Sequence, residues 1–223
     1  MVNIVGHRGA AGLAPENTLA GFEHAIDLGV DAIEFDVRAT VDGTPVLLHD
    51  ATLERTTGTA GRLQDLELAD LRALGDRDDW YVPTLEEALT YFEDCPIELH
   101  VDIKETGVEA ATIRQLEAAA LAAPVIVFSS IPEVVRSIAD VPFDIGYSVS
   151  EVTRESLVFA TEHAVSFVLG PGRPDRPGVE WIEEHDMKAG ISTVNCHSAI
   201  QRSLELKPYS VLTDRPDLAL ELR

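Results

Sequence analysis

The chain has 223 residues, of which 45% are apolar, so it is long and apolar enough to build one domain with a sizeable core. Its 39 acidic side chains outnumber 17 lysines and arginines, and the formal net charge at pH 7 is −22. This charge excludes nucleic acid as a partner, because phosphate backbones are bound by basic surfaces, and it disfavours docking on anionic lipid headgroups.

The basic residues are skewed toward arginine. Lys104, Lys188 and Lys207 are the only lysines, whereas the acidic residues are spread along the whole chain. A spread-out excess of carboxylates with few lysines favours a halophilic protein, whose surface stays soluble in high salt because self-repulsion is screened there. An ordinary acidic cytosolic protein is the alternative interpretation.

The compartment is predicted from the first residues and from the cysteines. Residues 1–9 lead straight into a strand-like stretch without the regions of a signal peptide, and no apolar run is long enough to span a membrane. Cys95 and Cys196 are too few for a disulfide framework, and their apolar neighbours predict buried thiols. We therefore expect a cytoplasmic protein without stable membrane insertion; its oligomeric state is left open.

Short β-branched runs alternate with segments of helical periodicity. The expected strands are residues 2–6, 32–37, 97–103, 125–128, 143–147, 165–169, 189–194 and 210–212. The expected helices are residues 17–28, 85–92, 108–121, 133–138, 153–163, 179–185, 198–206 and 216–222, with Thr84 and Glu87 as a capping box before the second. This alternation implies parallel βαβ units and favours an α/β fold, a (β/α)8 TIM barrel, with a doubly wound sheet as the alternative.

One stretch interrupts the alternation. Asp42-Gly43 is a hairpin signal, and the apolar run 45–48 follows it. Residues 51–82 are then too many for a βα loop, whose usual length is about 2–6 residues. We expect a single domain over residues 1–223 with a small insertion at 51–82, on the face of the barrel where active sites lie.

His7-Arg8-Gly9 directly follows the first expected strand. A histidine and an arginine at a strand end combine a proton-transfer group with a guanidinium that can hold two phosphate oxygens. A salt-bridged loop without catalytic function is the alternative.

Glu34 and Asp36 lie on one face of the second expected strand, because residues two apart in a strand share a face. Two neighbouring carboxylates repel each other unless a cation compensates them. Hard divalent cations such as Mg²⁺ and Ca²⁺ prefer such oxygen ligands. A salt bridge to lysine or arginine is the alternative.

His49-Asp50 follows the hairpin strand, and His49 is a candidate general acid or base, although a lone histidine is more often structural. In the stretch 98–104 the charged residues share one face, which in a barrel strand belongs to a polar interior site. Asp102 and Lys104 lie nearest the carboxyl end, where they would add a third metal oxygen and an ammonium for phosphate.

Glu98 and His100 lie deeper in the same strand, where they are candidates for supporting the metal ligands. The whole set combines two histidines, three carboxylates, an arginine and a lysine near one rim. Such a set fits metal-assisted cleavage of a phosphoryl ester, in which one histidine takes a proton and the other protonates the leaving alkoxide.

These motifs resemble those of the glycerophosphodiester phosphodiesterase family, in the same order over nearly the whole chain. The first signature is matched by His7-Arg8-Gly9-Ala10 with Pro15-Glu16-Asn17-Thr18, and the second by Glu34-Phe35-Asp36-Val37 with His49-Asp50. Further similar segments are Arg55-Thr56-Thr57, Pro83-Thr84-Leu85-Glu86-Glu87, Thr193-Val194-Asn195 and Leu212-Thr213-Asp214-Arg215-Pro216-Asp217.

The resemblance implies a TIM barrel with one divalent cation, Mg²⁺ or Ca²⁺, that hydrolyses a small-molecule glycerophosphodiester to sn-glycerol 3-phosphate and an alcohol. It implies that His7 and His49 are the acid/base pair and that Arg8 binds the phosphate. Glu34 and Asp36 become metal ligands, and Asp102 and Lys104 align with the family's third-strand motif.

Three positions depart from the family pattern. The third-strand motif usually has glutamate where this chain has Asp102, which is one methylene shorter. A tryptophan usually precedes Thr-Val-Asn, whereas this chain has Ser192, so one wall of the expected pocket is missing. The insertion is also short, which predicts a more open pocket.

Two other functions remain as alternatives. A lysophospholipase D-type enzyme would need an apolar groove for an acyl chain, and the acidic surface weighs against it. A barrel that only binds a phosphoester would not need the acid/base pair.

Overall fold

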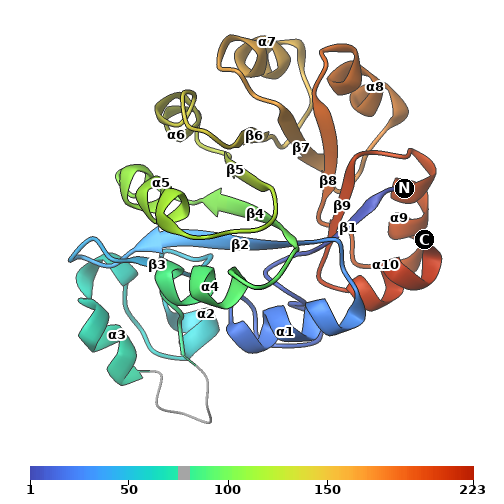
Figure 1. Cartoon of the computed structure of the whole chain (residues 1–223). Coiled ribbons are helices and arrows are strands. Elements are labelled where there is room, and N and C mark those ends of the chain that lie inside the picture. The colour runs from blue at the N-terminus through green and yellow to red at the C-terminus, as the bar shows by residue number, and fades with distance from the viewer. Residues whose placement is uncertain (75–80) are drawn as a thin grey trace.

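Eight parallel strands close into a barrel in the computed structural model, which describes residues 1–74 and 81–223 (Figure 1). β1 pairs with both β2 and β9, which closes the ring and confirms the expected (β/α)8 barrel over a doubly wound sheet. The barrel strands are β1 (Asn3–Gly6), β2 (Ala32–Ala39), β4 (Glu98–Ile103), β5 (Val125–Ser129), β6 (Asp144–Ser148), β7 (Phe167–Pro171), β8 (Lys188–Ser192) and β9 (Ser210–Thr213).

Helices surround the barrel, and the two termini lie near each other on its outside (Figure 1). The expected capping box is confirmed: the Thr84 hydroxyl accepts a bond from the backbone N–H of Glu87, whose side chain accepts from Thr84 N–H in return. The helices that follow the barrel strands are α1 (Leu19–Leu28), α4 (Leu85–Phe92), α5 (Glu109–Ala118), α6 (Pro132–Ser137), α7 (Arg154–Glu162), α8 (Arg176–Glu184), α9 (His197–Glu205) and α10 (Pro216–Leu222).

The ends of the elements differ from expectation by a few residues. The largest differences are of three residues. α8 begins three residues before its predicted start, and α5 ends three residues before its predicted end because Ala119 is already extended, with ψ 141°. The alanine-rich sequence favours a longer helix, but the chain must extend to reach Pro124 and the start of β5.

Apolar side chains fill the middle of the barrel, so polar groups gather at its two ends. The ring of Phe167 packs edge-on against Phe128 and against His100. Gly190 makes room for that ring, because a Cβ there would lie 2.5 Å from Phe167 Cζ. The buried cluster consists of Val5, Ala32, Ile126, Phe128, Phe167, Leu169 and Leu212. This plug leaves the carboxyl ends of the strands as the place for a polar site.

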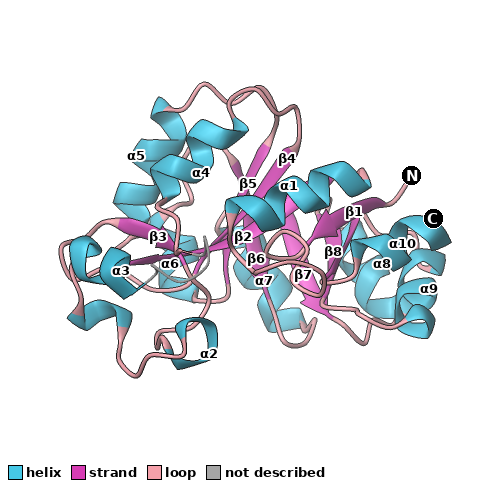
Figure 2. Ribbon diagram, turned by 90° about the horizontal axis from the view of Figure 1, so that it is seen from below, coloured by secondary structure: helices cyan, strands magenta, loops and turns pink. Residues whose placement is uncertain are grey.

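The described part of the segment between β2 and α4 lies beside the barrel, on the side away from the termini (Figure 2). β3 (Pro45–Leu47) pairs antiparallel with β2, as the hairpin signal predicted. The elements after it are α2 (Glu54–Thr57), the 3₁₀ turn η1 (Leu63–Asp65) and α3 (Leu68–Leu74). They pack around an apolar cluster of Val46, Leu48, Leu53, Leu63, Leu71 and Val82. Residues 75–80 of the expected insertion 51–82 lie outside the described residues.

The expectation of two buried thiols is wrong. Cys95 is half-buried, and Cys196 is exposed because it lies at the start of α9, where the chain leaves the barrel rim. Apolar neighbours in sequence therefore do not report burial in a loop between a strand and a helix. Among the described residues, no helix combines the length and the apolar character needed to cross a membrane.

Candidate functional site

The loop after β1 presents His7 and Arg8 at the rim of the barrel. Arg8 has a φ of 50° and Gly9 a φ of 86°, so two successive left-handed residues turn the chain sharply. Gly9 is required there because a Cβ would lie 2.8 Å from the carbonyl carbon and oxygen of Gly21 in α1. The turn directs the backbone N–H of Arg8 to Glu34 Oε2 at 2.8 Å.

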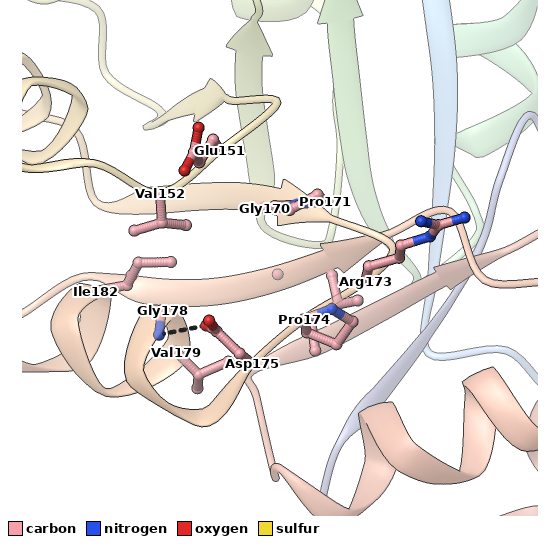
Figure 3. A pocket seen from close by; sticks show the side chains of 12 residues that line it. Glu151, Val152, Gly170, Pro171, Arg173, Pro174, Asp175, Gly178, Val179 and Ile182 are labelled. Carbon is pink, nitrogen blue, oxygen red and sulfur yellow. Dashed lines mark hydrogen bonds between the residues drawn. The ribbon is translucent and has the colours of Figure 1, made fainter.

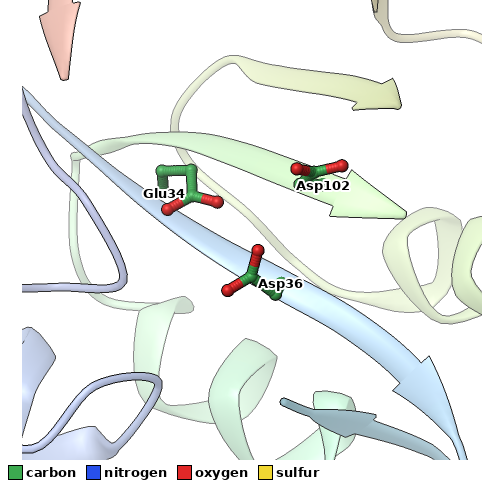
Figure 4. A group of neighbouring side chains, drawn as sticks. All are labelled: Glu34, Asp36 and Asp102. Carbon is green, nitrogen blue, oxygen red and sulfur yellow. The ribbon is translucent and has the colours of Figure 1, made fainter. Parts of the chain in front are cut away.

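Three carboxylates predicted from the sequence lie together at this rim (Figure 4). Glu34 and Asp36 come from β2, and Asp102 comes from β4, where the strand register places it directly beside Asp36. One oxygen from each residue lies within 4.8 Å of the other two. The side chains are buried, so water screens their mutual repulsion only weakly.

Two cations neutralise part of this charge. Lys104 Nζ lies 2.7 Å from Asp102 Oδ2 and 3.1 Å from Asp36 Oδ1. Arg8 Nε lies 3.2 Å from Asp36 Oδ2. The salt bridges considered as an alternative to a metal site are therefore present, and they join the predicted phosphate-binding residues to the predicted metal ligands.

The charges remain unbalanced, and the pKa values reflect this. Burial, together with the charge of Asp36, raises the pKa of Glu34 to about 7. Burial also raises the pKa of Asp102 to about 6, against the opposing effect of Lys104. Burial acts in the same direction on Asp36, but Lys104 and Arg8 outweigh it, and the pKa of Asp36 is lowered.

The two histidines are each bonded to a carboxylate through Nδ1. His7 Nδ1 lies 2.6 Å from Asp214 Oδ1, and His49 Nδ1 lies 2.6 Å from Asp50 Oδ1. Burial lowers the pKa of His7, but Glu34 and Asp214 outweigh it, so this pKa is raised. Burial also lowers the pKa of His49, and the nearby Asp36 and Asp50 carboxylates do not reverse this.

Several residues that sequence reasoning did not select support the site. Asn17 donates from Nδ2 to Asp36 Oδ2 at 2.8 Å and accepts from the Asp36 backbone N–H at 3.1 Å. Glu16 accepts from Arg8 at 3.0 Å and from Arg55 of the insertion at 2.5 and 2.7 Å. The Pro-Glu-Asn-Thr motif thus carries site residues as well as the cap of α1, a role that its position between strand and helix does not reveal.

Glu98 and His100 lie where the sequence placed them, deeper in β4. His100 Nε2 lies 2.7 Å from Glu98 Oε1, and the Tyr209 hydroxyl donates to Glu98 Oε2 at 2.6 Å. They form a polar cluster in the barrel toward the amino ends of the strands. Ser192 ends β8, and its hydroxyl lies 2.8 Å from Thr193 Oγ1.

A separate pocket of about 260 Å³ lies between the loop after β6 and α8 (Figure 3). Its carboxylates are Glu151 and Asp175, and Asp175 already accepts a bond from Gly178 N–H as the cap of α8. No histidine lines it, and none of the predicted site residues does. The candidate active site is therefore the rim with the three carboxylates and two histidines.

The chain is similar to one family of known proteins. A model described as the glycerophosphoryl diester phosphodiesterase family matches residues 7–126. The glycerophosphodiester phosphodiesterase of Caldanaerobacter subterraneus is 26% identical, and the match covers 98% of this chain and 96% of that protein. Human glycerophosphodiester phosphodiesterase 1 is 33% identical over 156 residues, which cover 65% of this chain and 47% of the human protein. The chain thus spans about half the length of some curated relatives that it matches.

A solved structure shares the fold over nearly the whole chain. It is a phosphodiesterase of Oleispira antarctica in complex with the product sn-glycerol-3-phosphate. Its TM-score is 0.91 at 25% identity, and the match covers 99% of this chain and 96% of that chain.

Proposed function

We propose, because the chain belongs to the glycerophosphoryl diester phosphodiesterase family, that it hydrolyses glycerophosphodiesters to sn-glycerol 3-phosphate and an alcohol. The observation that carries this proposal is the gathering of two histidines, three carboxylates and two cations at one end of the barrel. The product bound in the Oleispira antarctica structure supports the same product here.

The carboxylates suit a divalent cation. Within residues 1–74 and 81–223, Asp36 Oδ1 and Asp102 Oδ1 are buried and have no hydrogen-bond partner, so both oxygens retain unused acceptor capacity. We propose that Glu34, Asp36 and Asp102 hold Mg²⁺ or Ca²⁺, both of which prefer oxygen ligands. A bound ion of this kind stabilises negative charge on a phosphoryl group.

The two cationic side chains would bind the phosphate. Lys104 donates one hydrogen bond, to Asp102 Oδ2, and forms an ion pair with Asp36 without a hydrogen bond to it, so N–H donors remain for a ligand. Arg8 Nε forms an ion pair with Asp36 at 3.2 Å but makes no hydrogen bond to a described residue, so this buried N–H retains donor capacity for a phosphate oxygen.

The histidines would move the protons. The raised pKa of His7 favours its protonated form, so we assign His7 as the donor of a proton to the leaving alkoxide. The lowered pKa of His49 favours its neutral form, so we assign His49 as the acceptor of the proton from the attacking hydroxyl. Hydrolysis consumes one water, forms one phosphorus–oxygen bond and breaks the phosphorus–oxygen bond to the leaving alkoxide. One proton of the water ends on the alcohol, and the other stays on the phosphate monoester or passes to solvent, depending on the pH.

The test is a substrate panel with purified protein. Glycerophosphocholine and glycerophosphoethanolamine, each with Mg²⁺, Ca²⁺ or Mn²⁺, should release sn-glycerol 3-phosphate, and EDTA should stop the release. His7→Ala and His49→Ala should each lower kcat by about 10²-fold or more with little change in melting temperature. His24→Ala, on the exposed face of α1, is the matched control and should leave kcat unchanged.

Two results would contradict the proposal. If no glycerophosphodiester is cleaved with any of the three ions, the assigned activity is wrong. If lysophospholipids are cleaved faster than their deacylated counterparts, the protein belongs with the lysophospholipase D-type enzymes instead.

A further inference from the structure

The imidazole of His7 is hydrogen-bonded through Nδ1 to the carboxylate of Asp214, near the carboxyl-terminal end of the sequence. β1 and β9 are neighbours in the closed barrel, with Gly6 beside Thr213, so the next residue of each strand faces the other. His7 Nδ1 lies 2.6 Å from Asp214 Oδ1, and both side chains are mostly buried. The contact therefore exists only because the barrel closes.

Asn195, in the loop after β8, fixes the orientation of this carboxylate. Its Nδ2 donates to Asp214 Oδ2, and its Oδ1 accepts from the Asp214 backbone N–H at 2.8 Å. The same Oδ1 also accepts from Thr213 Oγ1 at 3.2 Å. One carboxylate oxygen of Asp214 thus faces an amide, and the other faces the imidazole.

This arrangement selects one form of the imidazole ring. An ionised carboxylate only accepts hydrogen bonds, so Nδ1 of His7 must carry a proton. Nε2 of His7 then faces the opposite way, toward Glu34 Oε2 at 3.8 Å. In a neutral ring this leaves Nε2 as the atom that exchanges a proton with a bound ligand.

We propose that Asp214, oriented by Asn195, is a positioning residue that holds His7 in the Nδ1–H tautomer with Nε2 turned into the active site. The inference rests on the proposed phosphodiesterase function. It extends that function by two residues from the last two loops of the barrel. Asp214 acts through His7 and needs no contact with the substrate.

The neighbouring amide makes Asp214→Asn an informative variant. Two NH₂ groups cannot face each other, so the introduced amide should turn its oxygen toward Asn195 Nδ2. Its NH₂ group then points at His7 Nδ1, which must become an acceptor, and the ring proton moves to Nε2. The variant is nearly isosteric, so it should invert the tautomer while it preserves packing.

Adding Asn195→Asp should reverse this inversion. The new carboxylate can accept from the NH₂ group of the amide at position 214, which returns the amide oxygen to His7. It can also still accept from the backbone N–H of residue 214 and from Thr213 Oγ1. Rescue by the second substitution would not follow from a merely structural role of either residue.

The experiment has two independent readouts on the metal-loaded protein with glycerophosphocholine. Nitrogen-15 NMR at alkaline pH should report Nδ1–H for His7 in the wild type and in the double variant, and Nε2–H in Asp214→Asn. Asp214→Asn should lower kcat about 10²-fold or more, while KM stays within about threefold of the wild-type value. The double variant should have a kcat at least about tenfold higher than that of Asp214→Asn. Asp217→Asn removes a charge from the same segment and should change neither readout.

Double-variant kinetics test whether Asp214 acts through His7. Adding Asp214→Asn to the His7→Ala variant should lower its kcat no further, because the effects of substitutions at residues that act as a unit are not additive. The inference is overturned if Asp214→Asn keeps the wild-type kcat, or if Asp214→Asn lowers kcat as much in the His7→Ala background as in the wild type. It is also overturned if neutral wild-type His7 carries its proton on Nε2. A wild type that cleaves no substrate would refute the proposed function, whereas the NMR readout would still decide the tautomer.

Discussion

The ammonium group of Lys104 lies 2.7 Å from Oδ2 of Asp102, so the acidic cluster contains a cation of its own. Lys104 also lies 3.1 Å from Asp36 Oδ1, and these ion pairs raise its pKa despite burial. An ammonium and a divalent cation would therefore stabilise the same carboxylates. Their contributions to stability should be partly interchangeable.

Lys104→Met should make the protein depend on metal for its stability. Removing one partner of a buried ion pair costs about 3–5 kcal/mol, which for a chain of this size lowers the melting temperature in EDTA by roughly 6–20 °C. Mg²⁺ should then raise the melting temperature more in the variant than in the wild type. Lys188→Met, whose partner Asp144 is partly exposed at the other end of the barrel, is the control. Equal metal-induced shifts in the wild type and Lys104→Met would contradict this prediction.

The metal-free protein should become less stable as the pH rises through the range in which Glu34 titrates. The ordinary pKa of a glutamate side chain is 4.5, and burial together with Asp36 raises the pKa of Glu34 to about 7. The folded state therefore binds more protons than the unfolded state across this window. It follows that the contribution of Glu34 to stability is present at low pH and is lost as the pH approaches 7.

Glu34→Gln isolates this effect from the other acidic groups. In EDTA, the difference in melting temperature between the variant and the wild type should grow in favour of the variant between about pH 5 and pH 7.5. Asp50 titrates in the opposite sense, because Arg55 and His49 lower its pKa to about 2, and its contribution cancels in the comparison. A pH-independent difference would show that Glu34 is ionised throughout.

Arg55 connects the insertion to the surroundings of both His49 and Arg8. Its Nε donates to Asp50 Oδ2 at 2.5 Å, and its two Nη groups donate to the carboxylate of Glu16. Asp50 in turn contacts His49, and Glu16 contacts Arg8. One half-exposed guanidinium thus fixes the carboxylates behind the proposed base and the proposed phosphate ligand.

Arg55→Ala should move the acid limb of the activity profile to higher pH. Without the guanidinium, the Asp50 charge acts on His49 unopposed, so the pKa of His49 should rise and the neutral base should form only at higher pH. The melting temperature should change little, because exposed ion pairs contribute about 0–1 kcal/mol. Arg62→Ala, an exposed arginine of the same insertion, should leave the profile unchanged. A shift to lower pH would exclude this coupling.

Much of the fold and the centre of the site could be predicted from the sequence because both depend on local patterns. Alternating strand and helix periodicities indicate the barrel, and i, i+2 spacing brings Glu34 and Asp36 to one face. Asp102 joins them because consecutive parallel strands align their ends. The seven residues predicted for the site therefore came from the first half of the chain, where the motifs are dense.

The hydrogen bonds by which other residues support these seven could not be predicted in the same way. Asp214 reaches His7 only through closure of β1 on β9, a pairing across 207 positions that no local period encodes. Asn17 lies in a tight loop with a φ of 55°, and neither the expected helix 17–28 nor the Pro-Glu-Asn-Thr signature reveals its contact with Asp36. Loop geometry and barrel closure are tertiary properties, so residues that depend on them require the structure.

The net charge of −22 should make substrate binding improve with salt. A negative protein repels an anionic phosphodiester over distances near the Debye length, which shrinks from about 10 Å at 0.1 M salt to about 3 Å at 1 M. Arg8 and Lys104 are mostly buried, so their attraction at short range is screened less than the repulsion from the surface.

KM should therefore fall, and the melting temperature should rise, as KCl increases from about 0.1 M to about 2 M at constant Mg²⁺. Sucrose at matched water activity is the control, because it stabilises folded proteins without screening charge, and it should leave KM unchanged. If activity instead falls steadily over this range, the excess of carboxylates is not an adaptation to salt. The assignment of His7 and His49 would be untouched by that result, since it rests on the groups that surround each imidazole at the rim and not on the surface charge.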